Sequence, residues 1–104
     1  MKMNKLMCTG VLALLMAAGV VHAAGDVAAG EAKSANCSGC HGEDGKGIDP
    51  SPPLAGMDES FHVEQLKAYK SGERDHAVMK MFAEQLSEQD MEDVAAYYSS
   101  LDSE

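Results

Sequence analysis

The chain has 104 residues and a formal charge of −9, with 24% charged and 45% hydrophobic positions. Its length and composition suit a single globular domain, and its acidic balance argues against nucleic acid as a partner, because phosphate binding needs clusters of Lys and Arg. Only five positions are aromatic and none is Trp, so an aromatic-rich core is excluded.

Residues 1–23 have the pattern of an export signal. Two lysines form a basic start, an apolar run follows over residues 6–21, and small residues precede Ala24. The run is interrupted by Thr and Gly and is shorter than the roughly 20 residues that a membrane span needs; an uncleaved anchor is the alternative. We therefore expect cleavage before Ala24, a periplasmic location, and one mature domain over residues 24–104 without a membrane span.

The first predicted helix begins after Asp26, a suitable N-cap residue. Ala28, Ala32 and Ala35 follow at helical spacing and would share one face. Residues 37–53 are then rich in Gly, Ser, Asp and Pro, a composition typical of a loop.

Two further helices are predicted in the second half of the chain. One covers residues 60–71, with Gly72 at the position of a C-terminal stop. The other begins at Ser87, which forms the pattern of a capping box with Asp90. The predicted buried stripes are Phe61, Gln65, Leu66 and Tyr69 in the former, and Met91, Val94, Ala95, Tyr98 and Leu101 in the latter. Because no segment alternates with period two, the predicted fold class is all-α.

The pattern Cys37-Ser38-Gly39-Cys40-His41 carries the chemistry. Two thiols at this spacing can add to the vinyl groups of haem, and the adjacent imidazole can bind the iron, so C-x-x-C-H indicates attachment of haem c. A thioredoxin-like redox pair would need a βαβ context. A zinc site would need two further ligands, for which His62 and His76 are the only other imidazoles of the mature chain. A structural disulfide is the third alternative in an exported protein.

A covalently fixed haem would also supply the large apolar surface that the short helices need for a core. Its iron has a second axial position, and a thioether there would raise the reduction potential whereas a second imidazole would lower it. Met91 lies on the buried stripe of the last helix and is expected to be a core residue, whereas Met79 and Met81 lie in a stretch between predicted helices. The candidate ligands are Met57, Met79, Met81, Met91, His62 and His76.

With these residues in view, the chain resembles a class I cytochrome c, and in particular the short periplasmic bacterial members whose folds form the halves of di-haem cytochromes c. The resemblance covers residues 25–101. It rests on Ala24-Gly25-Asp26 with Gly30, Cys37-Ser38-Gly39-Cys40-His41-Gly42, Pro52-Pro53-Leu54-Ala55-Gly56, Gln65-Leu66, Tyr69-Lys70-Ser71-Gly72, Met79, Leu86-Ser87-Glu88-Gln89-Asp90 and Ala95-Ala96-Tyr97-Tyr98.

The resemblance implies how the iron is bound. The family places its methionine ligand eight residues before the Ser of the last helix, which is Met79 here, with Met81 as the second choice. Its P-x-L segment implies that the carbonyl of Pro52 accepts a hydrogen bond from Nδ1–H of His41. Pro53 leaves that register open by one residue.

The resemblance further implies that the first and last helices cross where Gly30 meets Tyr97. The chain departs from the family in two ways: it lacks Trp, and the segment before the methionine is short. The residues that would contact the haem propionates therefore stay open, and Arg74 is a candidate. His62 and His76 are expected to be solvated surface residues.

These features favour electron transfer over catalysis. No nucleophile is paired with a base and no loop could cradle phosphate, so we expect a soluble one-electron carrier rather than an enzyme. The mature chain has a formal charge of −11, since the export signal removes two lysines and no acids, and it would be steered toward redox proteins with basic docking faces; the acids could instead serve solubility alone. The alternative functions are a haem-bearing subunit of a larger oxidoreductase complex and a gas-binding or peroxidatic haem protein.

Overall fold

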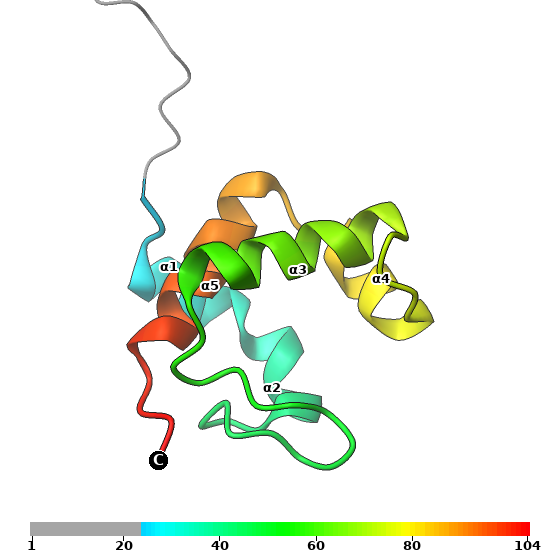
Figure 1. The fold of residues 1–104 in the computed structure, drawn as a ribbon. Helices are drawn as coiled ribbons and strands as arrows, with labels where there is room; N and C mark the ends of the chain where they lie inside the picture. Colours follow the sequence, from blue (N-terminus) through cyan, green and yellow to red (C-terminus); the bar gives the residue numbers. More distant parts are fainter. Residues whose placement is uncertain (1–23) are drawn as a thin grey trace, which may run out of the picture.

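The computed structural model describes residues 24–104, and the predicted export signal lies outside them. The described residues form five helices and no named strand, which confirms the all-α prediction (Figure 1). None of these helices combines the length and apolarity of a membrane span. The helices are α1 (Val27–Lys33), α2 (Ala35–His41), α3 (Glu59–Ser71), α4 (Ala77–Glu84) and α5 (Glu88–Ser100).

Helices α1 and α5 cross in direct contact (Figure 1). A Cβ atom on Gly30 would overlap the carbonyl oxygen of Asp93 and lie 2.8 Å from Cβ of Tyr97. At Gly25 an added Cβ would lie 2.8 Å from Cβ of Ala96. The predicted contact between Gly30 and Tyr97 is thereby confirmed, and it depends on the absence of side chains at two points.

The first helix begins as predicted, but the prediction of a loop from residue 37 is wrong. The carboxylate of Asp26 caps α1, and α1 ends at Lys33. The chain then resumes a helix at Ala35 that includes the whole thiol motif through residue 41. Gly and Ser are poor helix formers in isolation, but here α2 continues from α1 with only Ser34 between them. The loop begins at Gly42, whose φ is +89°.

The predicted helix over residues 60–71 is confirmed as α3, with Asp58 as its N-cap and Gly72 in the left-handed conformation at its end. Its buried face differs from the predicted stripe, because His62 is buried beside Leu66 and Tyr69 whereas Phe61 is 49% exposed.

A second helix that was not predicted, besides α2, follows α3. Helix α4 includes Met79 and Met81, which the sequence suggested lay between helices. It is short, and its N-cap is His76, whose Nδ1 accepts a hydrogen bond from the N–H of Met79 at 3.2 Å. An imidazole is an unusual cap, and Asp75 directly before it, a residue type favoured at this position, is not the cap.

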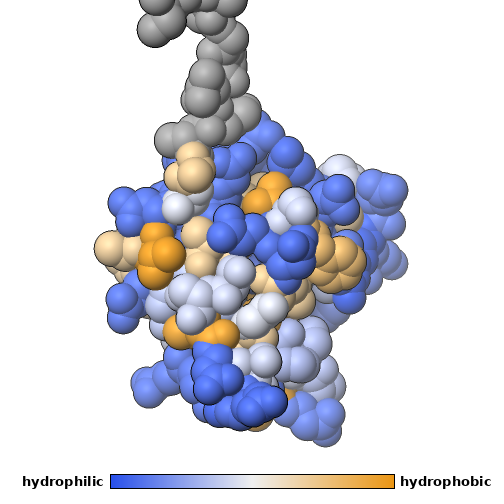
Figure 2. Space-filling model, turned by 60° about the vertical axis from the view of Figure 1, so that its left-hand side comes forward, coloured by the Kyte–Doolittle hydropathy of each residue, from blue (hydrophilic) through white to orange (hydrophobic). Residues whose placement is uncertain are grey.

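Helix α5 supplies most of the core. The capping box between Ser87 and Asp90 is present as predicted. The four predicted core residues within the helix are buried, and Leu101 is its C-cap; the four are Met91, Val94, Ala95 and Tyr98. On the face shown in Figure 2, hydrophilic residues surround scattered hydrophobic ones.

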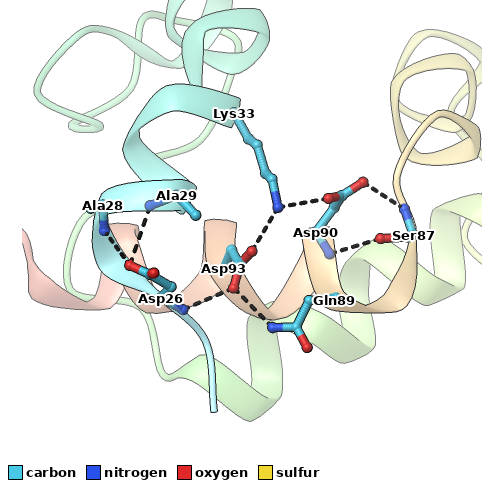
Figure 3. Close-up of polar contacts among 8 residues, drawn as sticks. All are labelled: Asp26, Ala28, Ala29, Lys33, Ser87, Gln89, Asp90 and Asp93. Atoms are coloured by element: carbon cyan, nitrogen blue, oxygen red, sulfur yellow. Dashed lines mark hydrogen bonds and ion pairs between the residues drawn. The ribbon is translucent and has the colours of Figure 1, made fainter. Parts of the chain in front are cut away.

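A buried carboxylate joins the two crossing helices (Figure 3). Asp93 on α5 is only 4% exposed. Its side chain accepts hydrogen bonds from the N–H of Asp26 at 2.8 Å, from Nζ of Lys33 at 2.6 Å, and from Nε2 of Gln89 at 2.9 Å. Lys33 also pairs with Asp90 at 2.7 Å. The hydrogen bond from the backbone of Asp26 and then that from Lys33 lower the pKa of Asp93 to about 2.

The change Asp93→Asn should lower the free energy of unfolding by roughly 2 kcal/mol at neutral pH. A depressed pKa means that the stabilisation is present above the ordinary carboxyl pKa of 3.8 and is lost as the pH falls toward 2. The difference between wild type and variant should therefore shrink in acid. Urea unfolding of the haem-loaded protein at a series of pH values measures it.

Glu31→Gln is the matched control, because it removes an exposed carboxylate from α1. This control should change the free energy of unfolding by less than about 0.5 kcal/mol. An Asp93→Asn variant as stable as wild type at neutral pH would contradict the assignment.

Candidate haem site

A cavity of about 570 Å³ lies between α2, α3, α4 and the loop that follows α2. This volume falls within the range of about 300–1,000 Å³ that is usual for cofactor and ligand sites. Its walls are mainly apolar, as an apolar ring system requires. The apolar lining consists of Leu54, Met57, Phe61, Leu66, Val78, Met79, Phe82 and Val94.

The three residues of the C-x-x-C-H motif line this cavity together. Cys37 and Cys40 lie one helical turn apart on α2, which places them on the same face. Both are free cysteines in the part of the chain that the structure describes, so the disulfide that was an alternative is not found there. Cys37 is half-buried and Cys40 is exposed, and burial raises the pKa of the Cys37 thiol.

The imidazole of His41 is held in one orientation. His41 is buried, and its Nδ1–H donates to the carbonyl oxygen of Pro52 over 2.7 Å. This confirms the bond expected from the resemblance and fixes the register at Pro52 rather than Pro53. With Nδ1 carrying the proton, the lone pair of Nε2 is free to bind a metal.

The loop that supplies this carbonyl is tied back onto the motif. The N–H of Gly47 donates to the carbonyl of His41 at 2.8 Å, and that of Leu54 donates to the carbonyl of Gly45 at 2.7 Å. Gly47 has φ of +89°, and a Cβ there would lie 2.9 Å from the backbone nitrogen of Pro53. A side chain at this glycine would therefore displace the segment that orients His41.

The structure separates the methionine candidates. Met79 on α4 and Met57 both line the cavity and are half-buried. Met81 is 52% exposed and is not among the lining residues. Met91 is 2% exposed within the core, as predicted.

The prediction that His62 is a solvated surface residue is wrong. It is 3% exposed, lines the cavity, and lies 5.7 Å from Tyr98 between ring centroids. Its Nδ1 has no hydrogen-bond partner among residues 24–104. Burial, and then the charge of His41, lower the pKa of His62 to about 4. The signal for burial was the spacing of His62 and Leu66, four residues apart on one helix face.

The other polar residues considered lie at the edge of the cavity. His76 is exposed, as predicted, and still belongs to the lining. The guanidinium of Arg74 lies 4.6 Å from the ring centroid of Tyr69 and donates to Oε1 of Gln65 at 2.6 Å. Arg74 also lines the cavity, next to the space that a bound ligand would occupy.

The site therefore offers an apolar cavity, two free thiols one turn apart, and an imidazole nitrogen available to a metal. These residues fit haem c, which needs all three.

Comparison with known proteins agrees with this fit. The model of the family described as Cytochrome c matches residues 27–102. Cytochrome c4 of Pseudomonas aeruginosa is 44% identical over 99 residues, which cover 94% of this chain and 49% of that protein. Cytochrome c-554(548) of Halomonas halodenitrificans is 46% identical over 81 residues, which cover 74% of this chain and 98% of that protein.

Solved structures show the same similarity. Reduced cytochrome c4 from Pseudomonas stutzeri has a TM-score of 0.71 at 40% identity, covering 76% of this chain and 47% of that one. Thiosulfate dehydrogenase from Marichromatium purpuratum has a TM-score of 0.70 at 30% identity, covering 73% and 19% respectively. The chain thus spans about half the length of the cytochromes c4 that it matches. It belongs to the cytochrome c family, and its cofactor is covalently bound haem c.

Proposed function

We propose that the chain is a mono-haem cytochrome that carries single electrons between redox proteins in the periplasm. In this proposal Cys37 and Cys40 form the two thioether bonds, and His41 and Met79 bind the iron. The observation that carries the proposal is that one cavity is lined by both free thiols, the oriented imidazole and Met79. Haem bound there supplies an iron that gains and loses one electron.

The protein's own residues favour electron transfer over catalysis at the metal. The hydrogen bond to Pro52 holds the His41 ring in one tautomer. Met79 reaches the cavity from α4, while α2 carries the histidine. If both axial positions are taken by the chain, a substrate has no open position on the iron. A thioether ligand also favours reduced iron and raises the potential.

Charge supports partners with basic docking faces. Each of the six Lys and Arg side chains in the described part of the chain already has a partner within the molecule, whereas acids outnumber them. The pairs are Lys33 with Asp90 and Asp93, Lys67 with Glu88, Lys80 with Glu84, Lys46 with the carbonyl of Glu104, Lys70 with the carbonyl of Leu86, and Arg74 with Gln65. Residues 24–104 contain 17 Asp and Glu against six Lys and Arg, so their net charge is negative and favours partners with basic faces.

The periplasmic location follows from the predicted export signal over residues 1–23. Haem attachment and signal cleavage have one joint readout, the mass of the purified protein. It should equal the polypeptide from Ala24 plus one haem. A colourless product with the mass of bare polypeptide would refute the proposal.

A second candidate function is that of the haem-bearing partner of a dehydrogenase. The structural similarity to a thiosulfate dehydrogenase favours it. Purification of the tagged chain from its native periplasm distinguishes the two functions, since a free carrier elutes alone and a subunit elutes with a stoichiometric partner.

The change Met79→Leu should abolish the far-red sulfur-to-iron absorption band of the oxidised protein, because it removes the thioether from the cavity. Met81→Leu is the matched control two residues along the same helix. It should leave the band unchanged, since Met81 is exposed. Loss of the band in Met81→Leu alone would show that the assignment is wrong, and loss in Met57→Leu alone would transfer the ligand role to Met57.

Electron transfer to small probes should depend on salt with a sign set by the probe's charge. Oxidation by the cationic tris(phenanthroline)cobalt(III) should slow as ionic strength rises, by roughly ten-fold at most. Oxidation by anionic hexacyanoferrate(III) should accelerate, because screening weakens its repulsion. Stopped-flow measurements of both reactions test the steering, and rates that are independent of salt for both probes would remove it.

A further inference from the structure

We propose that His76 is a positioning residue that holds Met79 in place for the iron. This inference rests on the proposed function, in which Met79 is the axial ligand. The observation is that the chain between α3 and α4 folds back so that His76 is held from one side by α3 and itself holds the first turn of α4.

The contact with Met79 is direct. Nδ1 of His76 accepts a hydrogen bond from the backbone N–H of Met79 at 3.2 Å. The first turn of a helix has N–H groups without partners inside the helix, and the N-cap side chain satisfies one of them. Here the satisfied group belongs to the ligand residue itself. The carbonyl of His76 also accepts a hydrogen bond from the N–H of Lys80 at 2.9 Å. His76 therefore binds the backbone N–H groups of both Met79 and the residue after it.

The imidazole is in turn anchored on α3. Its ring meets the ring of Tyr69 edge-on, with centroids 6.0 Å apart and planes at 78°. Tyr69 is buried and carries the guanidinium of Arg74 over its ring at 4.6 Å. Arg74 donates to Oε1 of Gln65 at 2.6 Å, and its backbone N–H donates to the carbonyl of Ala68 at 3.0 Å. We call Gln65, Tyr69, Arg74 and His76 the capping cluster.

Helix α4 packs against α3 but buries little of its own surface, so the contacts of its first turn contribute to its position. Ala83 is its one buried residue, and its ion pair between Lys80 and Glu84 is exposed and 4.0 Å long. Exposed pairs of this kind contribute little. Loss of the cap would therefore allow the first turn to open more often, and with it the sulfur would leave the iron more often.

The test uses imidazole added to the oxidised haem-loaded protein, because it must displace the methionine before it can bind the iron. Its apparent affinity therefore reports the fraction of molecules in which the sulfur has left. The change His76→Phe keeps a ring against Tyr69 and removes the acceptor. It should bind imidazole about five-fold more tightly than wild type, which is the effect of losing a typical N-cap.

The matched variant is His76→Asn, which restores an acceptor suited to the N-cap and removes the ring. It should bind imidazole less tightly than His76→Phe and keep the far-red band, because it retains an acceptor for the N–H of Met79 and loses only the ring contact with Tyr69. If His76→Asn binds imidazole as tightly as His76→Phe, the hydrogen bond to Met79 does not hold the ligand and the proposal is overturned. Circular dichroism of both variants establishes that they are folded.

Met79→Leu distinguishes failure of this inference from failure of the proposed function. If the far-red band survives in Met79→Leu, Met79 is not the ligand, and both that assignment and the positioning role of His76 are wrong. If Met79→Leu abolishes the band while His76→Phe leaves the imidazole affinity unchanged, the ligand assignment stands and the positioning role of His76 is wrong.

Discussion

The crossing of α1 and α5 is the constraint on which the rest of the structure depends. It is close because Gly25 and Gly30 have no side chains to hold the backbones apart, and it is joined by the carboxylate of Asp93. Since α2 follows α1 after a single residue, the position of the crossing also determines where the cysteines and the histidine lie. The haem motif is thus placed by the contacts of α1 with α5 as well as by those that His41 makes with Pro52 and Gly47.

The two sides of the cavity are held in place by different kinds of contact. The side that carries His41 is held by backbone hydrogen bonds of a glycine-rich loop, which bring the Pro52 carbonyl to the imidazole. The side that carries Met79 is a short helix held by side chains of α3. The His41 side is therefore positioned mainly by main-chain hydrogen bonds, and the Met79 side by side-chain contacts that substitutions can remove.

Short-range sequence patterns correctly predicted the helix starts that depend on neighbouring residues alone. Asp26, Ser87 and Asp90 cap their helices where the sequence placed them, and the thiol motif lies on the cavity. The failures have tertiary causes. Helix α2 contains Gly39 and continues from α1, while α4 begins at an imidazole that is held by Tyr69. His62 was expected to be a solvated surface residue, but its helix face is the one that meets the core. The bond to Pro52 came from family resemblance and not from spacing alone.

The hydrogen bond between Asp26 and Asp93 spans 67 positions of the chain, so the two ends of the domain must meet before either is stable. Closing so long a loop costs entropy that no short segment can offset by itself. Fragments that lack either end would leave Gly25 and Gly30 without the α5 backbone that packs on them, or the carboxylate of Asp93 without its donors on the first helix. The domain should consequently assemble in a single cooperative transition, in which the haem-binding region gains its order at the same moment as the two ends come together.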